Sequence, residues 1–90
     1  MPRYIIERNF PTGLAVPMTD EGATGLARIA VVNARKGVTW LHSYVSLDKT
    51  RSYCVYDAPT PEAIREVGHL NELPVGSITQ VAVLDPYFYY

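Results

Sequence analysis

The chain lacks the features that mark several large classes of protein. It has a single cysteine in 90 residues, so it cannot form an internal disulfide and does not fit an extracellular disulfide scaffold. Its formal net charge is −1, whereas a nucleic-acid-binding domain usually needs a basic surface that neutralises phosphates. We therefore expect no nucleic-acid partner.

Long apolar segments are also missing. The longest apolar run, residues 26–32, is interrupted by Arg28 and is far too short to span a bilayer. The first residues, Met1 to Arg8, become charged too early for a secretory signal peptide. These observations predict no membrane partner and a cytoplasmic location.

The motifs of common catalytic sites are absent as well. The sequence has no nucleophile elbow, no phosphate-binding glycine loop and no compact His-x-x-x-His or Cys-x-x-Cys pair. Gly22 and Gly25 fall inside a helical pattern, not after a strand, so they do not form a dinucleotide fingerprint. Nothing in the pattern requires catalysis; whether the protein is an enzyme stays open, and the sequence favours a non-enzyme.

What the chain does contain is a composition that supports a packed core. Hydrophobic residues make up 48% of the sequence, which is typical of a globular protein. A length of 90 residues leaves no room for a second core, so we expect one domain that covers residues 1–90.

Alternating patterns predict three strand regions. Residues 3–10 form a first strand, residues 38–58 a hairpin of two strands, and residues 77–85 a last strand. A turn at residues 48–49 would set the register of the hairpin. That register places Ser43 opposite Cys54 and Tyr44 opposite Tyr53.

Helical patterns fill the two long connections. The first helix starts after Thr19 or Asp20 as its cap and ends before Gly37. The second starts with Thr60 as its cap and Pro61 in its first position. Periodicity predicts two buried stripes, Ala23, Leu26, Ala27, Ala30, Val31 and Ala34 in the first helix and Ala63, Ile64, Val67 and Leu70 in the second.

The resulting order is strand, helix, strand, strand, helix, strand. This βαββαβ order is that of the α+β ferredoxin-like fold, in which an antiparallel sheet carries both helices on one face. The other sheet face is left open, and its residues decide what the protein can bind.

The open face predicted for the hairpin is dense in aromatic and coordinating side chains. Its members are Trp40, His42, Tyr44, Tyr53, Val55 and Asp57. Such a patch is expected to be an interface or a ligand groove, lined by Trp40, Tyr44, Tyr53 and Asp57. Two copies that close these faces against each other would form a homodimer. The aromatic ending, residues 86–90, either packs on its own core or crosses to the partner.

His42 and Glu7 are the residues on this face with the most chemistry. An imidazole with carboxylates and water suits Ni, Zn, Cu or Fe, and a mid-strand carboxylate needs solvent or a partner. His42 and Glu7 are therefore candidate metal ligands. Two alternatives stay open: they form an acid–base pair of a small-molecule site in the open-face groove, or His42 only holds a subunit interface together.

Several segments together resemble a known family, the DUF4242 family of small bacterial proteins. The resemblance is carried by residues 2–8, by the segment 37–45 with its Trp-x-His-Ser-Tyr-Val pattern, by residues 54–66 and by the ending at residues 83–86. The family implies a dimeric ferredoxin-like protein, and one actinobacterial member is described as nickel-binding. The resemblance thus implies Ni²⁺ as a cofactor, while the choice of His42 and Glu7 comes from their chemistry alone.

Overall fold

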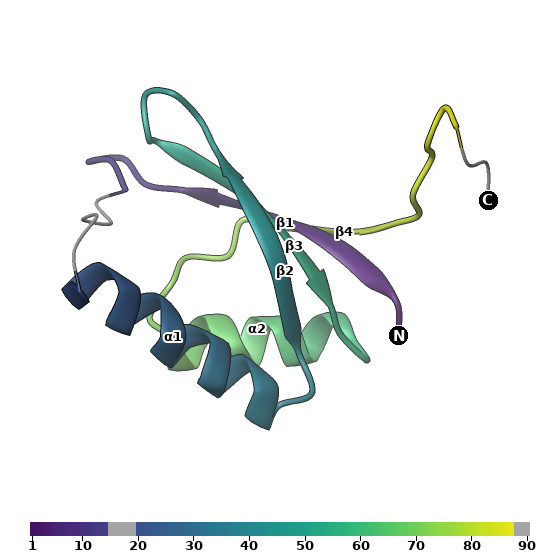
Figure 1. Cartoon of the computed structure of the whole chain (residues 1–90), viewed down its shortest axis with the longest axis horizontal. Coiled ribbons are helices and arrows are strands. Elements are labelled where there is room, and N and C mark those ends of the chain that lie inside the picture. The colour runs from purple at the N-terminus through teal and green to yellow at the C-terminus, as the bar shows by residue number, and fades with distance from the viewer. Residues whose placement is uncertain (15–19, 88–90) are drawn as a thin grey trace.

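The computed structural model describes residues 1–14 and 20–87. Six elements follow in the predicted order: β1 (Arg3–Asn9), α1 (Asp20–Arg35), β2 (Thr39–Val45), β3 (Arg51–Asp57), α2 (Pro61–Leu70) and β4 (Ser77–Val81). The strands form one antiparallel sheet in the order β2-β3-β1-β4. Both helices lie on the same side of this sheet (Figure 1), so the predicted α+β ferredoxin-like fold is confirmed.

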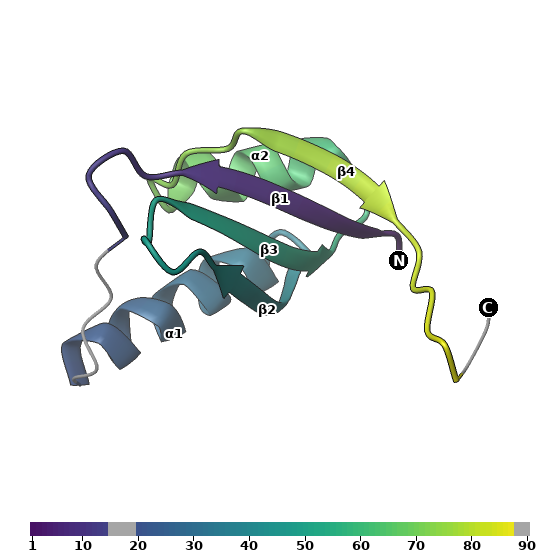
Figure 2. The ribbon, with the colours of Figure 1, turned by 90° about the horizontal axis from the view of Figure 1, so that it is seen from above.

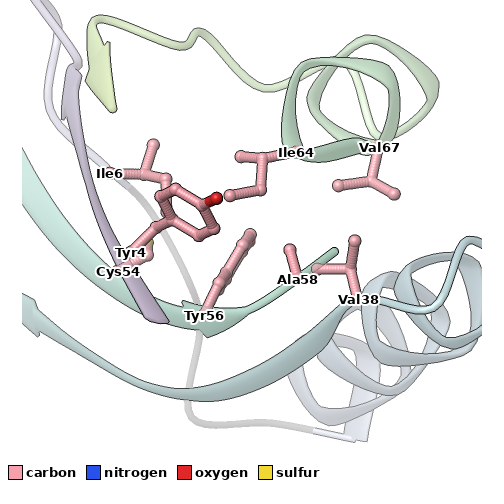
Figure 3. Packing of buried hydrophobic residues seen from close by; sticks show 8 residues of the cluster. All are labelled: Tyr4, Ile6, Val38, Cys54, Tyr56, Ala58, Ile64 and Val67. Carbon is pink, nitrogen blue, oxygen red and sulfur yellow. The ribbon is translucent and has the colours of Figure 1, made fainter. Parts of the chain in front are cut away.

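The core lies between α2 and the two central strands, which Figure 2 shows side by side in the middle of the sheet. Alternate residues of β1 and β3 point to this side, as a period of two requires. Each fully buried large apolar side chain contributes roughly 1.5–3 kcal/mol. The cluster in Figure 3 consists of Tyr4, Ile6, Val38, Cys54, Tyr56, Ala58, Ile64 and Val67.

The predicted register of the hairpin is confirmed in its outer half. Ser43 lies opposite Cys54, and Tyr44 lies opposite Tyr53. This half is closest to the turn, so the turn at residues 48–49 fixes its pairing.

A β-bulge at Leu41 changes the register in the inner half. His42 lies opposite Val55, but Trp40 lies opposite Tyr56, so one residue of β2 is left without a counterpart. One extra residue moves every residue before it to the other face. Trp40 therefore packs against the core on the helix side, and its predicted place on the open face is wrong.

The buried side of α1 differs from the predicted stripe. Gly22 and Asn33 are buried and Ile29 is half-buried. The predicted residues are all exposed: Ala23, Leu26, Ala27, Ala30, Val31 and Ala34.

Hydrogen bonds explain why α1 turns this side inward. The Asn33 carbonyl accepts from the backbone N–H of Val38 at 2.9 Å, and its side-chain Oδ1 accepts from Asn71 Nδ2 at 3.1 Å. A mostly alanine stripe gains little from burial, because each alanine adds only one methyl group. The hydrogen bonds at the end of α1 therefore contribute more to its orientation than burial of the alanine stripe would.

The second helix begins as predicted. The Thr60 hydroxyl accepts a hydrogen bond from the backbone N–H of Ala63 at 3.2 Å, and a proline follows the cap. Within the predicted stripe, Ile64 and Val67 are buried. Leu70 is 52% exposed, so the prediction that it is buried is wrong.

The last strand is shorter than predicted. It ends at Val81, which lies opposite Arg3, the first residue of β1. The residue before Arg3 is Pro2, which has no N–H to continue the ladder. Residues 82–87 leave the sheet, as Figure 1 shows. Among the described helices, none has the length and apolar character needed to cross a membrane.

Candidate functional site

His42 lies in the middle of β2, an edge strand, and its side chain is exposed on the open face. Its ring meets the ring of Tyr44 edge-on, with centroids 5.2 Å apart and planes at 86°. Within the described part of the chain, no hydrogen bond engages its ring nitrogens. The imidazole is therefore available to a metal ion or to another chain.

Glu7 lies on the same face but on β1. It is opposite Tyr53 of β3, and its Oε1 atom is 3.9 Å from Nη1 of Arg51. Strands are spaced about 4.8 Å apart, and β3 separates β1 from β2. Glu7 is level with Tyr53, whereas His42 is level with Val55, two residues further along β3, so Glu7 and His42 are separated by roughly 12 Å. The structure does not bring the two candidates together within one chain, so the acid–base pair considered from the sequence is not assembled there.

The remaining open-face candidates have different surroundings. Tyr44 is 65% exposed, and Tyr53 is half-buried beside it. Asp57 is held at the end of β3 by Arg3, which donates to its two oxygens at 2.9 and 3.3 Å. This hydrogen bonding lowers the pKa of Asp57, and it directs the carboxylate toward Arg3.

The described residues contain no group of three His, Cys, Asp or Glu side chains that could hold a metal ion. A single chain therefore offers His42 as an isolated imidazole donor on the open face. An ion bound there would need water or a second chain for its other ligands.

A second candidate site lies on the opposite side of the sheet. A cavity of about 270 Å³ is bounded by α1 through Leu26 and Ile29 and by the sheet through Trp40, Val45 and Tyr56. The sequence pattern does not predict this cavity, because it assigns Trp40 to the open face. It also predicts an inward side of α1 that is rotated by one residue from the observed one.

Arg8 is buried beside this cavity. Its side chain points to the helix side of β1, and the residue is only 1% exposed. Nη1 donates to Cys54 Sγ at 3.8 Å and Nη2 to the Tyr56 hydroxyl at 3.4 Å, while Nε has no partner. No carboxylate of the described residues forms an ion pair with it. The alternation of Tyr4, Ile6 and Arg8 along β1 could have revealed this buried cation from the sequence.

Two comparisons with known proteins find similarity to SCO4226-like proteins. A family model described as "Nickel responsive protein SCO4226-like" matches residues 4–81. The crystal structure of SCO4226 from Streptomyces coelicolor A3(2) superposes with a TM-score of 0.74, at 14% identity, over 92% of this chain and 99% of that one. This likeness shows the fold alone. A search of the curated proteins finds no match.

Proposed function

The chain belongs to the family of nickel-responsive, SCO4226-like proteins, and from this premise we propose that it is a small cytoplasmic protein that binds Ni²⁺ or a similar divalent transition metal. We infer that the segments resembling the DUF4242 family reflect membership of this same family. One observation carries the proposal beyond the family description: His42 presents an exposed imidazole without a hydrogen-bond partner in the described chain. A neutral imidazole is a good ligand for such ions.

The ion is shared between two copies of the chain in this proposal. In a two-fold symmetric dimer, residue i of one copy that contacts residue j of the other is matched by the reverse contact. Glu7 and His42 lie on one face, two strands apart. In the proposed dimer, which closes through the open faces, Glu7 contacts the partner's His42, and the two-fold axis repeats this contact. Glu7 and His42 are too far apart to bind one metal ion within a chain, so the proposed metal site takes one of them from each copy.

The exposed residues of the open face and the tail support a homodimer. Beyond β4, Val83, Leu84 and Tyr87 are 48%, 74% and 88% exposed and thus scarcely covered by the rest of the chain. Tyr44, on the opposite edge strand, is also exposed, and apolar surface of this kind is solvated poorly by water. We propose that the tail crosses to the partner, although its last residues, 88–90, lie outside the described part. Sedimentation should give twice the 10.0 kDa mass of one chain at micromolar concentration.

Calorimetric titration with Ni²⁺ tests the metal ligand directly. We expect His42→Ala to weaken binding at least about tenfold, or about 1.4 kcal/mol. His69→Ala is the matched control, because His69 is the other histidine and is exposed on α2. Equal affinity of His42→Ala and the unsubstituted protein would remove His42 from the site.

The affinity should also depend on pH. Only the neutral imidazole binds a metal, so Ni²⁺ affinity should fall as the pH drops below about 6. Calorimetric titrations at several pH values, from neutral to mildly acidic, measure this directly. An affinity that stays constant over the series would contradict imidazole ligation.

A further inference from the structure

The cavity between α1 and the sheet has almost entirely apolar walls. The aliphatic side chains of Leu26, Ile29 and Val45 face the ring of Trp40 across it. The polar atom of Trp40 is already used, since Nε1 donates to the Ser43 hydroxyl at 2.9 Å. The walls therefore favour an apolar body, and a volume of about 270 Å³ suits a small molecule better than a peptide.

The charge of Arg8 lies directly behind one wall of this cavity. Cys54 and Tyr56 line the cavity, and both accept the hydrogen bonds of the Arg8 guanidinium. These bonds are at or beyond the long end of the usual range, and Nε has none. A buried cation without an anion is costly in free energy, so an anion that reaches it would be bound favourably.

We propose that this cavity binds a small amphipathic monocarboxylate, with its apolar body against Trp40 and Ile29 and its carboxylate paired with Arg8. A planar guanidinium holds a carboxylate through two parallel hydrogen bonds, which would replace the long contacts to Cys54 and Tyr56. One negative charge matches Arg8, the one cation buried among residues 1–14 and 20–87. A neutral apolar molecule would leave Arg8 unpaired, and an ammonium ion would be repelled by it.

The unsubstituted protein already provides a decisive comparison. Trp40 is the chain's single tryptophan and lines the cavity, so its fluorescence reports occupancy. Titrations use octanoate, 1-octanol and octylamine, three unbranched probes of eight carbon atoms that differ in their head groups. We expect octanoate to bind at least about tenfold more tightly than 1-octanol, and octylamine to bind least. Equal affinities for the three, or no response to octanoate, would overturn the proposal.

Substitution of Arg8 tests the charge pairing. Arg8→Met keeps a long side chain in the buried position but removes its charge, so octanoate should lose at least about tenfold in affinity while 1-octanol is unaffected. Arg28→Met is the control, because Arg28 is exposed on α1 and does not line this cavity. An equal loss in both variants would contradict the role of Arg8. If Arg8→Met fails to fold, as circular dichroism would show, the comparison of the three probes decides.

A cavity-filling substitution tests the place of binding. Ile29→Phe adds volume between α1 and the sheet, so octanoate and 1-octanol should both bind more weakly. Unchanged octanoate affinity in a folded Ile29→Phe protein would place the ligand elsewhere. This inference is independent of the metal: Arg8→Met should bind Ni²⁺ as the unsubstituted protein does, because Arg8 and His42 lie on opposite faces.

Discussion

Individual residues show most clearly where polar groups control this structure. Arg8 carries a charge into the core, where its guanidinium donates to the Cys54 thiol and the Tyr56 hydroxyl and lies over the Tyr56 ring, 5.7 Å from the ring centre. Burial raises the pKa of the Tyr56 phenol, while the charge of Arg8 acts in the opposite direction. Tyr56 therefore stays protonated at neutral pH, and no carboxylate in the described part of the chain pairs with the guanidinium.

Replacing Arg8 should not weaken the fold. Even a buried ion pair can often be replaced by apolar side chains of similar volume with no loss of stability, or with a gain of about 1–4 kcal/mol. A buried charge without an anion is more costly still. We expect this of Arg8→Met, measured by urea unfolding in the absence of any carboxylate. A loss of more than about 1 kcal/mol would mean that the contacts of Arg8 stabilise the core on balance.

Gly76 provides a second test at the residue scale. A Cβ atom there would lie 2.7 Å from the backbone oxygen of Glu7, which accepts a hydrogen bond from the Gly76 N–H at 2.9 Å. We expect Gly76→Ala to cost about 1–3 kcal/mol of unfolding free energy, because backbone must move. Gly25→Ala, in an exposed part of α1 with nothing within 4 Å, should instead be neutral or stabilising by up to about 1 kcal/mol. Similar effects of the two changes in chemical denaturation would contradict this account.

Among the elements, the hairpin depends on its turn. The Asp48 carboxylate accepts from the hydroxyls of Ser46 and Thr50, each at 2.7 Å, and from the Thr50 N–H at 3.0 Å. These hydrogen bonds lower the pKa of Asp48 to about 2. The next residue, Lys49, adopts a positive φ of 62°, which closes the turn.

The stabilising effect of this carboxylate should depend on pH. Its folded-state pKa lies below the ordinary unfolded value of about 3.9. The contribution is thus fully present above that value and is lost as the pH falls through about 2. Asp48→Ala should be less stable than the unsubstituted protein at neutral pH, and the difference should shrink toward pH 2. Urea unfolding at several pH values measures it, and a difference independent of pH would contradict the turn interaction.

The cap of α2 makes a smaller contribution. The Thr60 hydroxyl satisfies one backbone donor at the helix start, so Thr60→Ala should cost about 1 kcal/mol. Thr60→Ser keeps the hydroxyl and is the matched control. Equal losses for both in thermal or urea unfolding would show that the hydroxyl is not what matters.

The sequence predicted those elements whose local pattern and tertiary surroundings agree. The alternation of β1 and β3, the capped start of α2 and the pairing of Tyr44 with Tyr53 all follow from local chemistry. Two features depend on contacts that no local pattern carries. The bulge at Leu41 moves the Trp40 side chain from the open face to the helix side. The hydrogen bonds of Asn33 turn a different side of α1 toward the sheet than the apolar period predicts.

Those same errors hid the cavity from the sequence interpretation. Trp40 from β2 and Ile29 from α1 meet there only because both turn toward the helix side. The open face, by contrast, could be predicted for His42 and Glu7, since alternation alone places both. Their separation by β3 follows from the strand order, which also follows from the fold.

At the scale of the whole molecule, the two sheet faces have different properties. The open face carries an exposed imidazole, a carboxylate and tyrosines. The helix side carries a core, an apolar cavity and one buried cation. The proposed metal site therefore depends on how two copies meet, whereas the proposed carboxylate site is complete in one chain.

The central claim is that Glu7 of one copy and His42 of the other bind one ion, and a mixed dimer tests it most directly. Co-expression of His42→Ala chains with Glu7→Gln chains under two purification tags isolates dimers that contain one of each. Such a dimer keeps one intact pair across the two-fold axis but none within a chain. We predict that it binds one Ni²⁺ in calorimetry, while dimers of either variant alone bind at least about tenfold more weakly. A mixed dimer that binds no better than its two parents would contradict the account.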